Sequence, residues 1–305
     1  VYPGAYENIA DLLAQTIASR NAAGVEKPMN VAFFVNIVGT ARKFAALLDE
    51  RLKQTDRPYF EKWVGLSDAL TDAGGILPTQ EMLGKDKLAI QVSDEANVLP
   101  VGDKEFKHPL PESDVFVYLD HMEGRLYRNV WCGNLVHCAV AAMAQHKGLA
   151  FVELGGRDAY ICKVAEYALE EGMAGIAAEF GFAQEDMQKF GEGCKPAHYG
   201  ARTSSDTVGR VAADPKRKLA REDRMTGPAL LALRHGVTPF FIARAIAYVF
   251  LFDDREVAGY AALQDEIAAQ GIEKAIETYC QLDLEKPAER QLFGLILGHY
   301  REING

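Results

Sequence analysis

The sequence lacks most of the features that assign a chain to a specialised class. Its five cysteines are Cys132, Cys138, Cys162, Cys194 and Cys280. They are widely spaced and form no C-x-x-C pair, so neither a disulfide framework nor a zinc site is expected. The longest apolar run, "PFFIARAIAYVFLF", is shorter than a membrane span and contains Arg244. No signal-peptide pattern is visible, and a reducing cytoplasm fits best.

Positive charge is also scarce. The chain has 33 Lys and Arg against 43 Asp and Glu, a net charge of −10. Because an acidic surface repels phosphate backbones, a nucleic-acid partner is not expected, and a small-molecule partner is. Phosphate-loop motifs are missing as well, since "GEGCK" (191–195) and "GGILP" (74–78) fit neither G-x-G-x-x-G nor G-K-[ST]. A length of 305 residues favours two domains, in a monomer or homodimer.

The first third of the chain has the pattern of an α/β domain. Residues 5–22 and "TARKFAALLDERL" (40–52) have helical spacing, and "MNVAFFV" (29–35) is typical of a buried parallel strand. This alternation indicates a doubly wound sheet, in which ligands bind beyond the carboxyl ends of strands, where Asn36 lies. "KLAIQVS" and "NVLPVGD" are further strand candidates, and Pro100 predicts that the second is an edge or irregular strand.

From about Asp114 onward the chain reads almost entirely as helices, with long candidates over 157–181, 238–252 and 286–300. Thr238 is a candidate N-cap with Pro239 at the first helical position, and Pro287 opens the last helix. We therefore expect an α/β domain over 1–112 and an all-helical domain over 113–305.

Several polar residues are candidates for a site, and each has an ordinary alternative. Asn36 can cap the following helix, and Asp72 in "VGLSDALTDAGG" can serve a turn. Asn134 and His137 in "RNVWCGNLVH" lie about 60° apart on a helical wheel. They are either core residues or part of a catalytic set.

A basic block, "DPKRKLAREDRMTGP" (214–228), stands out in this acidic chain. Its cations are Lys216, Arg217, Lys218, Arg221 and Arg224. The block is either a solvated charged segment or a pocket for an anion, since arginine can bind phosphate through two hydrogen bonds.

Four blocks together resemble the polyol-specific long-chain dehydrogenases, also called the mannitol dehydrogenase family. They are "MNVAFFVNIVGTARKF", "VGLSDALTDAGGILP", "RNVWCGNLVH" and "DTVGRVAADPKRKLAREDRM", in the family's order. The last is the most specific, since it is similar to the family's "PLRKLSxxDRL". The resemblance implies a Rossmann-like NAD-binding domain followed by a helical domain. It also implies that the glycine-rich part of the nucleotide domain is absent from this chain.

The resemblance also implies roles for particular residues. The family's catalytic helix carries Lys-x4-Asn-x2-His, in which lysine is the general base, asparagine holds the alkoxide oxygen and histidine orients the substrate. Asn134 and His137 match this motif, and Asn36 matches a second asparagine at the strand end, beside the cofactor. Asp72 matches an acid expected to relay protons or support the site.

The position of the expected lysine holds Asn129, a neutral amide that cannot accept a proton near neutral pH. Nearby Arg125 stays protonated and is a poor base. Three explanations stay open: altered or lost chemistry, another base such as His137 or Asp72, or a slip in the helix register. If the register is right, Asn129 should share one cleft with Asn36, Asp72, Asn134 and His137.

The resemblance thus implies an enzyme that interconverts a polyol, or a polyol phosphate similar to mannitol 1-phosphate, with its ketose. The reaction is a metal-independent hydride transfer to NAD, with NADP as the alternative. Arg210, Arg217 and Lys218 are the expected substrate or phosphate contacts. Because of Asn129, the alternative is a catalytically impaired member that acts as a binding or regulatory protein.

Overall fold

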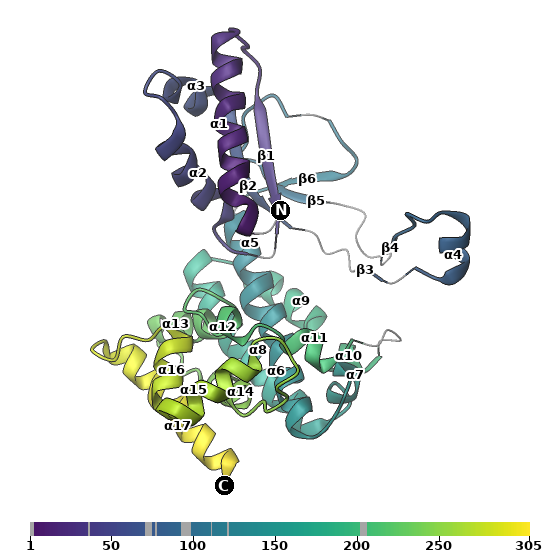
Figure 1. Cartoon of the computed structure of the whole chain (residues 1–305), viewed down its shortest axis with the longest axis vertical. Helices are drawn as coiled ribbons and strands as arrows, with labels where there is room; N and C mark the ends of the chain where they lie inside the picture. Colours follow the sequence, from purple (N-terminus) through teal and green to yellow (C-terminus); the bar gives the residue numbers. More distant parts are fainter. Residues whose placement is uncertain are drawn as a thin grey trace. The chain divides into compact units, whose positions relative to one another are not determined.

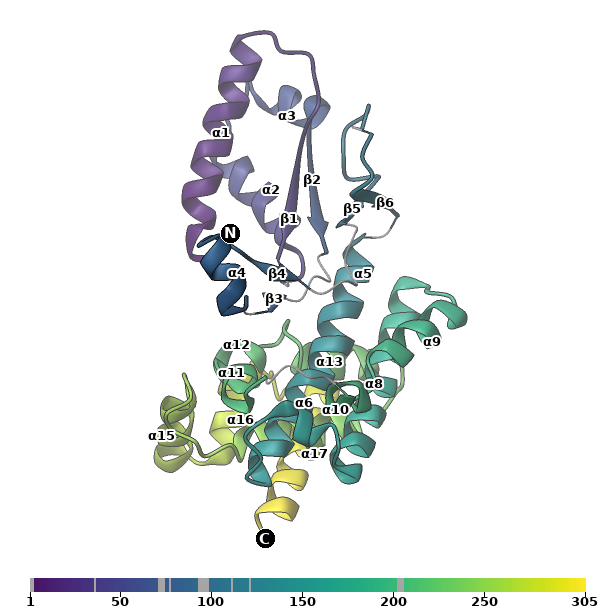
Figure 2. The ribbon, with the colours of Figure 1, turned by 90° about the vertical axis from the view of Figure 1, so that its right-hand side faces the viewer.

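The structure is a computed structural model that describes residues 3–35, 37–70, 75–76, 78–92, 99–110, 112–120, 122–201 and 206–305 (Figures 1 and 2). The chain forms two compact units, Val1–Leu126 and Tyr127–Gly305. The first is α/β and the second is helical. The predicted class, a partial Rossmann-like domain followed by a helical domain, is confirmed. The units divide after the predicted boundary near residue 112, because strand β6 (Phe116–Leu119) belongs to the first sheet.

The first unit contains most of the elements that the periodicity predicts. Its helices and strands are η1 (Pro3–Ala5), α1 (Tyr6–Ala22), β1 (Met29–Phe34), α2 (Thr40–Arg51), α3 (Arg57–Trp63), β2 (Val64–Ala69), β3 (Gly75–Ile76), α4 (Gln80–Lys85), β4 (Gln91–Val92), β5 (Leu99–Gly102) and β6, while α5 (Met122–Arg128) runs across the division. Helices α1 and α2 and strand β1 agree with the sequence. Strands β2 and β6 were not expected, because "VGLSDA" and "FVYL" lack a clear alternating pattern.

The main sheet has the order β1-β2-β5-β6 and mixes parallel and antiparallel pairs. The expectation that Pro100 marks an edge strand is wrong, because β5 lies between β2 and β6. The backbone N–H groups of Leu99 and Asp103 bond to the β6 side, at 2.7 and 3.1 Å. Pro100 therefore faces β2, where only its carbonyl is used, as acceptor from Leu70 N at 3.1 Å. A missing N–H is tolerated at this position.

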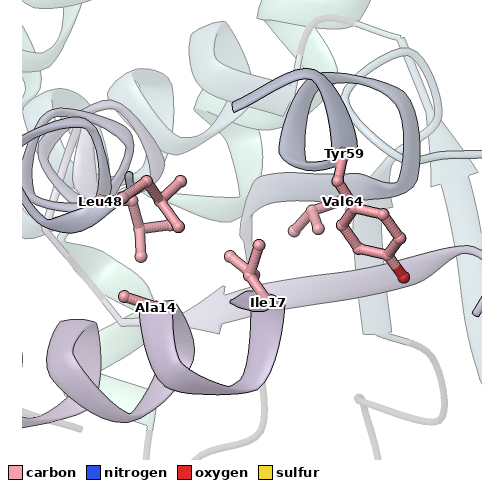
Figure 3. Packing of buried hydrophobic residues seen from close by; sticks show 6 residues of the cluster. Ala14, Ile17, Leu48, Tyr59 and Val64 are labelled. Atoms are coloured by element: carbon pink, nitrogen blue, oxygen red, sulfur yellow. The ribbon is translucent and has the colours of Figure 1, made fainter. Parts of the chain in front are cut away.

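The core of the first unit lies between the sheet and helices α1, α2 and α3. Figure 3 shows Ile17 of α1 and Leu48 of α2 directed toward Val64 of β2 and Tyr59 of α3. Residues along β1 alternate between the two faces of the sheet. Phe33 packs toward this helical layer, whereas Phe34 packs toward Phe106 on the other face.

The second unit is built from helices. They are η2 (Asn129–Gly133), α6 (Asn134–His146), α7 (Val152–Gly155), α8 (Ala159–Phe180), α9 (Gln184–Gly193), α10 (Ala197–Ala201), α11 (Val208–Ala212), α12 (Pro215–Lys218), α13 (Thr226–Arg234), α14 (Phe240–Phe250), α15 (Tyr260–Gln270), α16 (Ile272–Cys280) and α17 (Pro287–Asn304). Among its described residues, the one β-type pairing is an isolated bridge between Phe151 and Thr207. The predicted absence of a major sheet here is confirmed for those residues. None of the described helices is long and apolar enough to cross a membrane.

Helix α14 does not start as the sequence predicts. Its first residue is Phe240, so Pro239 occupies the N-cap position and Thr238 lies outside the helix. The carboxylate of Glu171, on α8, accepts hydrogen bonds from the backbone N–H groups of Phe241 and Ile242 at 2.9–3.1 Å. A carboxylate distant in sequence therefore satisfies the free N–H groups that a local cap would otherwise bind.

Candidate functional site

The candidate catalytic stretch contains a π-helical segment. In η2, the hydrogen bond from Asn134 N to Asn129 O spans five residues instead of four. Such segments frequently occur at functional sites, because they insert a residue into an otherwise regular helix. The stretch from Asn129 to His137 is therefore not one continuous α-helix, as the sequence motif suggested.

Asn129 lies half-buried at the start of this segment. A Cβ atom at Gly133 would stand 3.6 Å from Asn129 Oδ1 and 3.7 Å from Cys194 Sγ. Because Gly133 has no side chain, the amide oxygen of Asn129 can lie close to the π-helical turn. Because a neutral amide has no basic nitrogen, Asn129 can hydrogen-bond a ligand but cannot take its proton.

Asn134 and His137 lie on the first turn of α6. Asn134 Nδ2 and His137 Nε2 are both buried, and neither makes a hydrogen bond to any described residue. A buried polar group without a partner costs about 1–3 kcal/mol, so native proteins leave few of them. The unpartnered amide of Asn134 therefore fits a place where a ligand oxygen binds.

A charged residue beside His137, Asp206, was missed by the sequence reasoning. Asp206 Oδ2 lies 3.3 Å from His137 Nε2, at an angle that does not make a hydrogen bond. Arg210 donates from Nε to Asp206 Oδ1 at 2.6 Å and from Nη2 to Oδ2. Burial favours the neutral form of Asp206, but the contacts with His137 and Arg210 outweigh it and hold the pKa of this carboxyl well below its usual range.

Hydrogen bonds to helix α7 hold the backbone of Asp206 in place. Val152 N donates to Asp206 O at 2.9 Å, next to the bridge between Phe151 and Thr207. Glu153 Oε1 accepts a hydrogen bond from Asp206 N at 3.0 Å. The sequence carried one signal for this arrangement, the D-x3-R spacing of Asp206 and Arg210, which is typical of an ion pair on one helical face.

His137 is also held by an aromatic contact. Its ring is stacked on that of Tyr199, with centroids 5.0 Å apart and an interplanar angle of 13°. Helix α6 packs against α7, α8, α11 and α14, so its position is fixed by neighbours on several sides. The imidazole is therefore constrained by both its helix and a stacked ring.

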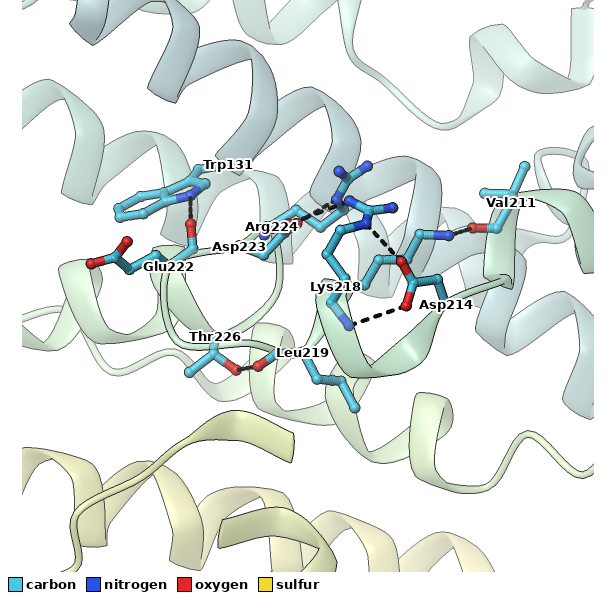
Figure 4. Close-up of polar contacts among 10 residues, drawn as sticks. Trp131, Val211, Asp214, Lys218, Leu219, Glu222, Asp223, Arg224 and Thr226 are labelled. Carbon is cyan, nitrogen blue, oxygen red and sulfur yellow. Dashed lines mark hydrogen bonds and ion pairs between the residues drawn. The ribbon is translucent and has the colours of Figure 1, made fainter. Parts of the chain in front are cut away.

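The basic block folds around Asp214 (Figure 4). Asp214 adopts a left-handed conformation, with φ 65°, and its side chain caps α12 by accepting from Arg217 N. Arg217 Nε also donates to Asp214 Oδ2 at 2.8 Å, and its Nη1 lies 3.4 Å from Asp223. The guanidinium stays partly exposed, so a further anion can reach it.

Lys218 of the block is buried and Arg224 is half-buried, which a fully solvated segment would not show. Lys218 is 8% exposed, and its Nζ donates to Val211 O. Burial lowers the pKa of Lys218. Arg224 pairs with Asp223 at 2.7 Å, and its side chain is 12% exposed. Arg221 instead makes two hydrogen bonds to the buried Glu289, so its role is structural.

Not every predicted site residue can be located. Asn36 and Asp72 lie outside the described residues, so their meeting with Asn134 and His137 in one cleft stays a prediction. The second unit contains all the other predicted residues: Asn129, Asn134, His137, Arg210, Arg217 and Lys218. His137 and Arg210 meet through Asp206.

Known proteins provide a comparison for this arrangement. No protein-family model matches the chain. A mannitol-1-phosphate 5-dehydrogenase of Brevibacillus brevis is 27% identical over 291 residues, which cover 95% of this chain and 73% of that protein. The enzyme of the same name from Bacillus licheniformis is 25% identical over 301 residues, or 99% of this chain and 76% of that protein.

Two solved structures share the fold. Mannitol 2-dehydrogenase of Pseudomonas fluorescens, in a ternary complex with NAD and D-mannitol, superposes with a TM-score of 0.66 and 14% identity. A substrate-free D-sorbitol dehydrogenase has the same TM-score and identity. This chain is covered at 94% and 93%, but it spans only 62% and 63% of those two chains.

The relatives by sequence and by fold agree with the four ordered blocks of the sequence. They cover both units, so the similarity is not confined to the α/β part. The helix with Asn134 and His137, Arg210, and the basic block with Lys218 lie in the matched region. The chain is therefore similar to mannitol-1-phosphate 5-dehydrogenases over most of its length, and it shares the fold of mannitol 2-dehydrogenase and D-sorbitol dehydrogenase.

Proposed function

We propose that this protein is an oxidoreductase that interconverts a polyol or polyol phosphate, similar to mannitol 1-phosphate, with the corresponding ketose. The reaction is a metal-independent hydride transfer with NAD. One observation carries the proposal: Asn134 Nδ2 is buried and without a hydrogen-bond partner among the described residues, on the same helical turn as His137 and directly after the π segment. The names of the relatives supply the substrate class.

The residues of the second unit would bind and orient the substrate. The Asn134 amide would donate to the alcohol oxygen, which gains negative charge as the carbonyl forms. His137 would contact the same or a neighbouring hydroxyl. Arg210, Arg217 and Lys218 would contact the polyol chain or its phosphate. Asn36 and Asp72 complete the proposed set, as a second amide at the oxygen and as an acid that supports the site.

The cofactor would be NAD, with NADP as the alternative, and it would accept the hydride when bound. An unpartnered buried amide beside a histidine fits an alcohol oxygen held next to a hydride acceptor. Asn36 is the proposed contact near the cofactor. Since the sequence has no glycine-rich phosphate motif, we assign no residue to the pyrophosphate.

The proposal also includes the cellular compartment, the class of partner and the oligomeric state. The five cysteines, all free, suit the reducing cytoplasm. The net charge of −10 suits a small-molecule partner rather than a nucleic acid. We propose a monomer or a homodimer.

Asn129 favours a second candidate function. Without the family's lysine, the chain would bind polyol and cofactor but turn them over slowly, and so act as a binding or regulatory protein. General base assistance typically contributes about 10²–10⁴-fold to a rate, so its loss would be conspicuous. Turnover distinguishes the two candidates.

The first prediction concerns Asn129→Lys in the full-length protein. A lysine here would supply the general base, so we expect polyol oxidation to rise by about tenfold or more. Steady-state NADH formation should be measured for both forms with mannitol 1-phosphate and with mannitol, from about pH 6 to 10. Lys189→Asn, at an exposed position on α9, is a control for a lysine–asparagine exchange.

The outcomes separate the candidates. Turnover by either form supports the dehydrogenase. Polyol binding without turnover in both forms supports the binding protein. If neither form binds or oxidises a polyol, the proposed function is wrong.

A further inference from the structure

Oxidation of an alcohol releases a proton, and Asn129 cannot accept it. A group elsewhere in the site must do so if the native chain turns over. We propose that His137 is the proton acceptor and that Asp206 is the residue that positions it and stabilises its charged form. This inference rests on the proposed function, and it assigns to Asp206 a role that the sequence motif does not contain.

The geometry is that of a histidine held by a carboxylate. His137 Nε2 lies 3.3 Å from Asp206 Oδ2, within the range of an ion pair. The stacked ring of Tyr199 limits the orientations of the imidazole. With Nε2 directed at the carboxylate, Nδ1 is the ring nitrogen that accepts a proton.

Asp206 is built to stay ionised and in place. Arg210 binds both of its oxygens, and its backbone is held by Val152 and Glu153. The side chains of His137 and Asp206 are 22% and 21% exposed, so water screens their attraction only in part. The ionised carboxylate therefore lies beside the imidazole in a site that is only partly open to water.

The remaining charged groups around His137 do not offer an equally good base. Arg210 stays protonated. Glu153 is buried and bound to the Asp206 backbone, and Lys218 Nζ is bound to Val211 O. Among the described residues, the imidazole is the neutral nitrogen base that the motif places beside Asn134.

The proposed step balances without a further reactant. The O–H bond of the substrate breaks and its proton moves to His137 Nδ1. The C–H bond on the same carbon would break with its electron pair as the carbonyl forms, and NAD, when bound, would accept the hydride. The imidazolium, paired with Asp206, then releases its proton to water.

The second prediction is the test, with Asp206→Asn in the full-length protein. We expect kcat for polyol oxidation to fall by about 10²-fold while KM changes by less than about threefold. Without the carboxylate charge, the acidic limb of the pH–rate profile should move to lower pH. Asp206→Glu, which keeps the charge, should recover part of kcat. His137→Gln should lower kcat at least as much as Asp206→Asn does, and its pH–rate profile should have no acidic limb.

A matched control is Asp265→Asn, which removes the carboxylate of an exposed arginine pair in the same unit. This variant should behave as the native protein. If Asp206→Asn lowers kcat without moving the acidic limb, or if Asp206→Glu recovers nothing, Asp206 is merely structural and the inference is wrong. Turnover by Asn129→Lys but not by the native chain would also overturn it, while leaving the proposed function intact. Absence of turnover in both would overturn both.

Discussion

Lys218 and Lys216 lie two residues apart in the same basic block, yet their surroundings differ. Lys216 is exposed, whereas Lys218 is buried beside Cys138 and Tyr260. An ammonium that has lost most of its water binds an anion more strongly than a solvated one does. At the residue scale, burial therefore separates a candidate phosphate ligand from a surface charge of the same type.

The third prediction follows from this difference. Lys218→Met should raise KM for mannitol 1-phosphate by about tenfold or more, because a charge-assisted hydrogen bond is lost. KM for mannitol, which has no phosphate, should change much less. Lys216→Met is the matched control and should leave both values close to native. An equal loss with both substrates would show that Lys218 does not recognise the phosphate.

Among the helices, α14 depends on a residue outside itself. Its first N–H groups are bonded to Glu171, a carboxylate on α8 that burial makes costly to ionise. Burial raises the pKa of Glu171 to about 7, although the backbone hydrogen bonds oppose this. A proton on this carboxyl thus links the packing of two long helices to pH.

The fourth prediction concerns this link. Because the folded pKa of Glu171 is raised, its protonation adds stability that is fully present below about pH 4.5 and lost as pH rises through about 7. We therefore expect the free energy of unfolding to fall from pH 5 to pH 8 in the native protein, and to fall less in Glu171→Gln. Urea unfolding at both pH values measures this.

The neighbouring Glu170 is exposed, and Glu170→Gln should keep most of the native pH dependence. If Glu171→Gln and the native protein have the same pH dependence, the buried carboxyl does not titrate in this range.

The whole molecule consists of two compact units with separate cores, and each contains one of the two tryptophans. Trp63 packs partly buried against the cluster of Ile17 and Leu48, and Trp131 is buried in the helical unit. The tryptophans can therefore report on the two units individually.

The fifth prediction uses these reporters. Ile17→Ala creates a cavity in the first unit and should lower its stability by about 2–5 kcal/mol. Ile246→Ala, at an equally buried position of α14, should do the same to the second unit. In a Trp131→Phe background, fluorescence of Trp63 follows the first unit, and in a Trp63→Phe background, fluorescence of Trp131 follows the second. Ile17→Ala should shift only the transition reported by Trp63, and Ile246→Ala only that reported by Trp131. Equal shifts of both transitions by either change would show that the units unfold as one.

The sequence by itself determined the class of the two units, most long helices and the helix that carries Asn134 and His137. These features depend on local hydrophobic period and on motif spacing, which a single chain displays directly. The same is true of Asn129, since a missing lysine is visible without coordinates.

Tertiary structure decided the rest. It placed β5 inside the sheet despite Pro100, inserted the π turn at Asn129 and gave α14 its cap from Glu171. It also brought Asp206 to His137, 69 positions along the chain from it. Such contacts join backbone groups and charges that are distant in sequence, and local periodicity contains no information about them.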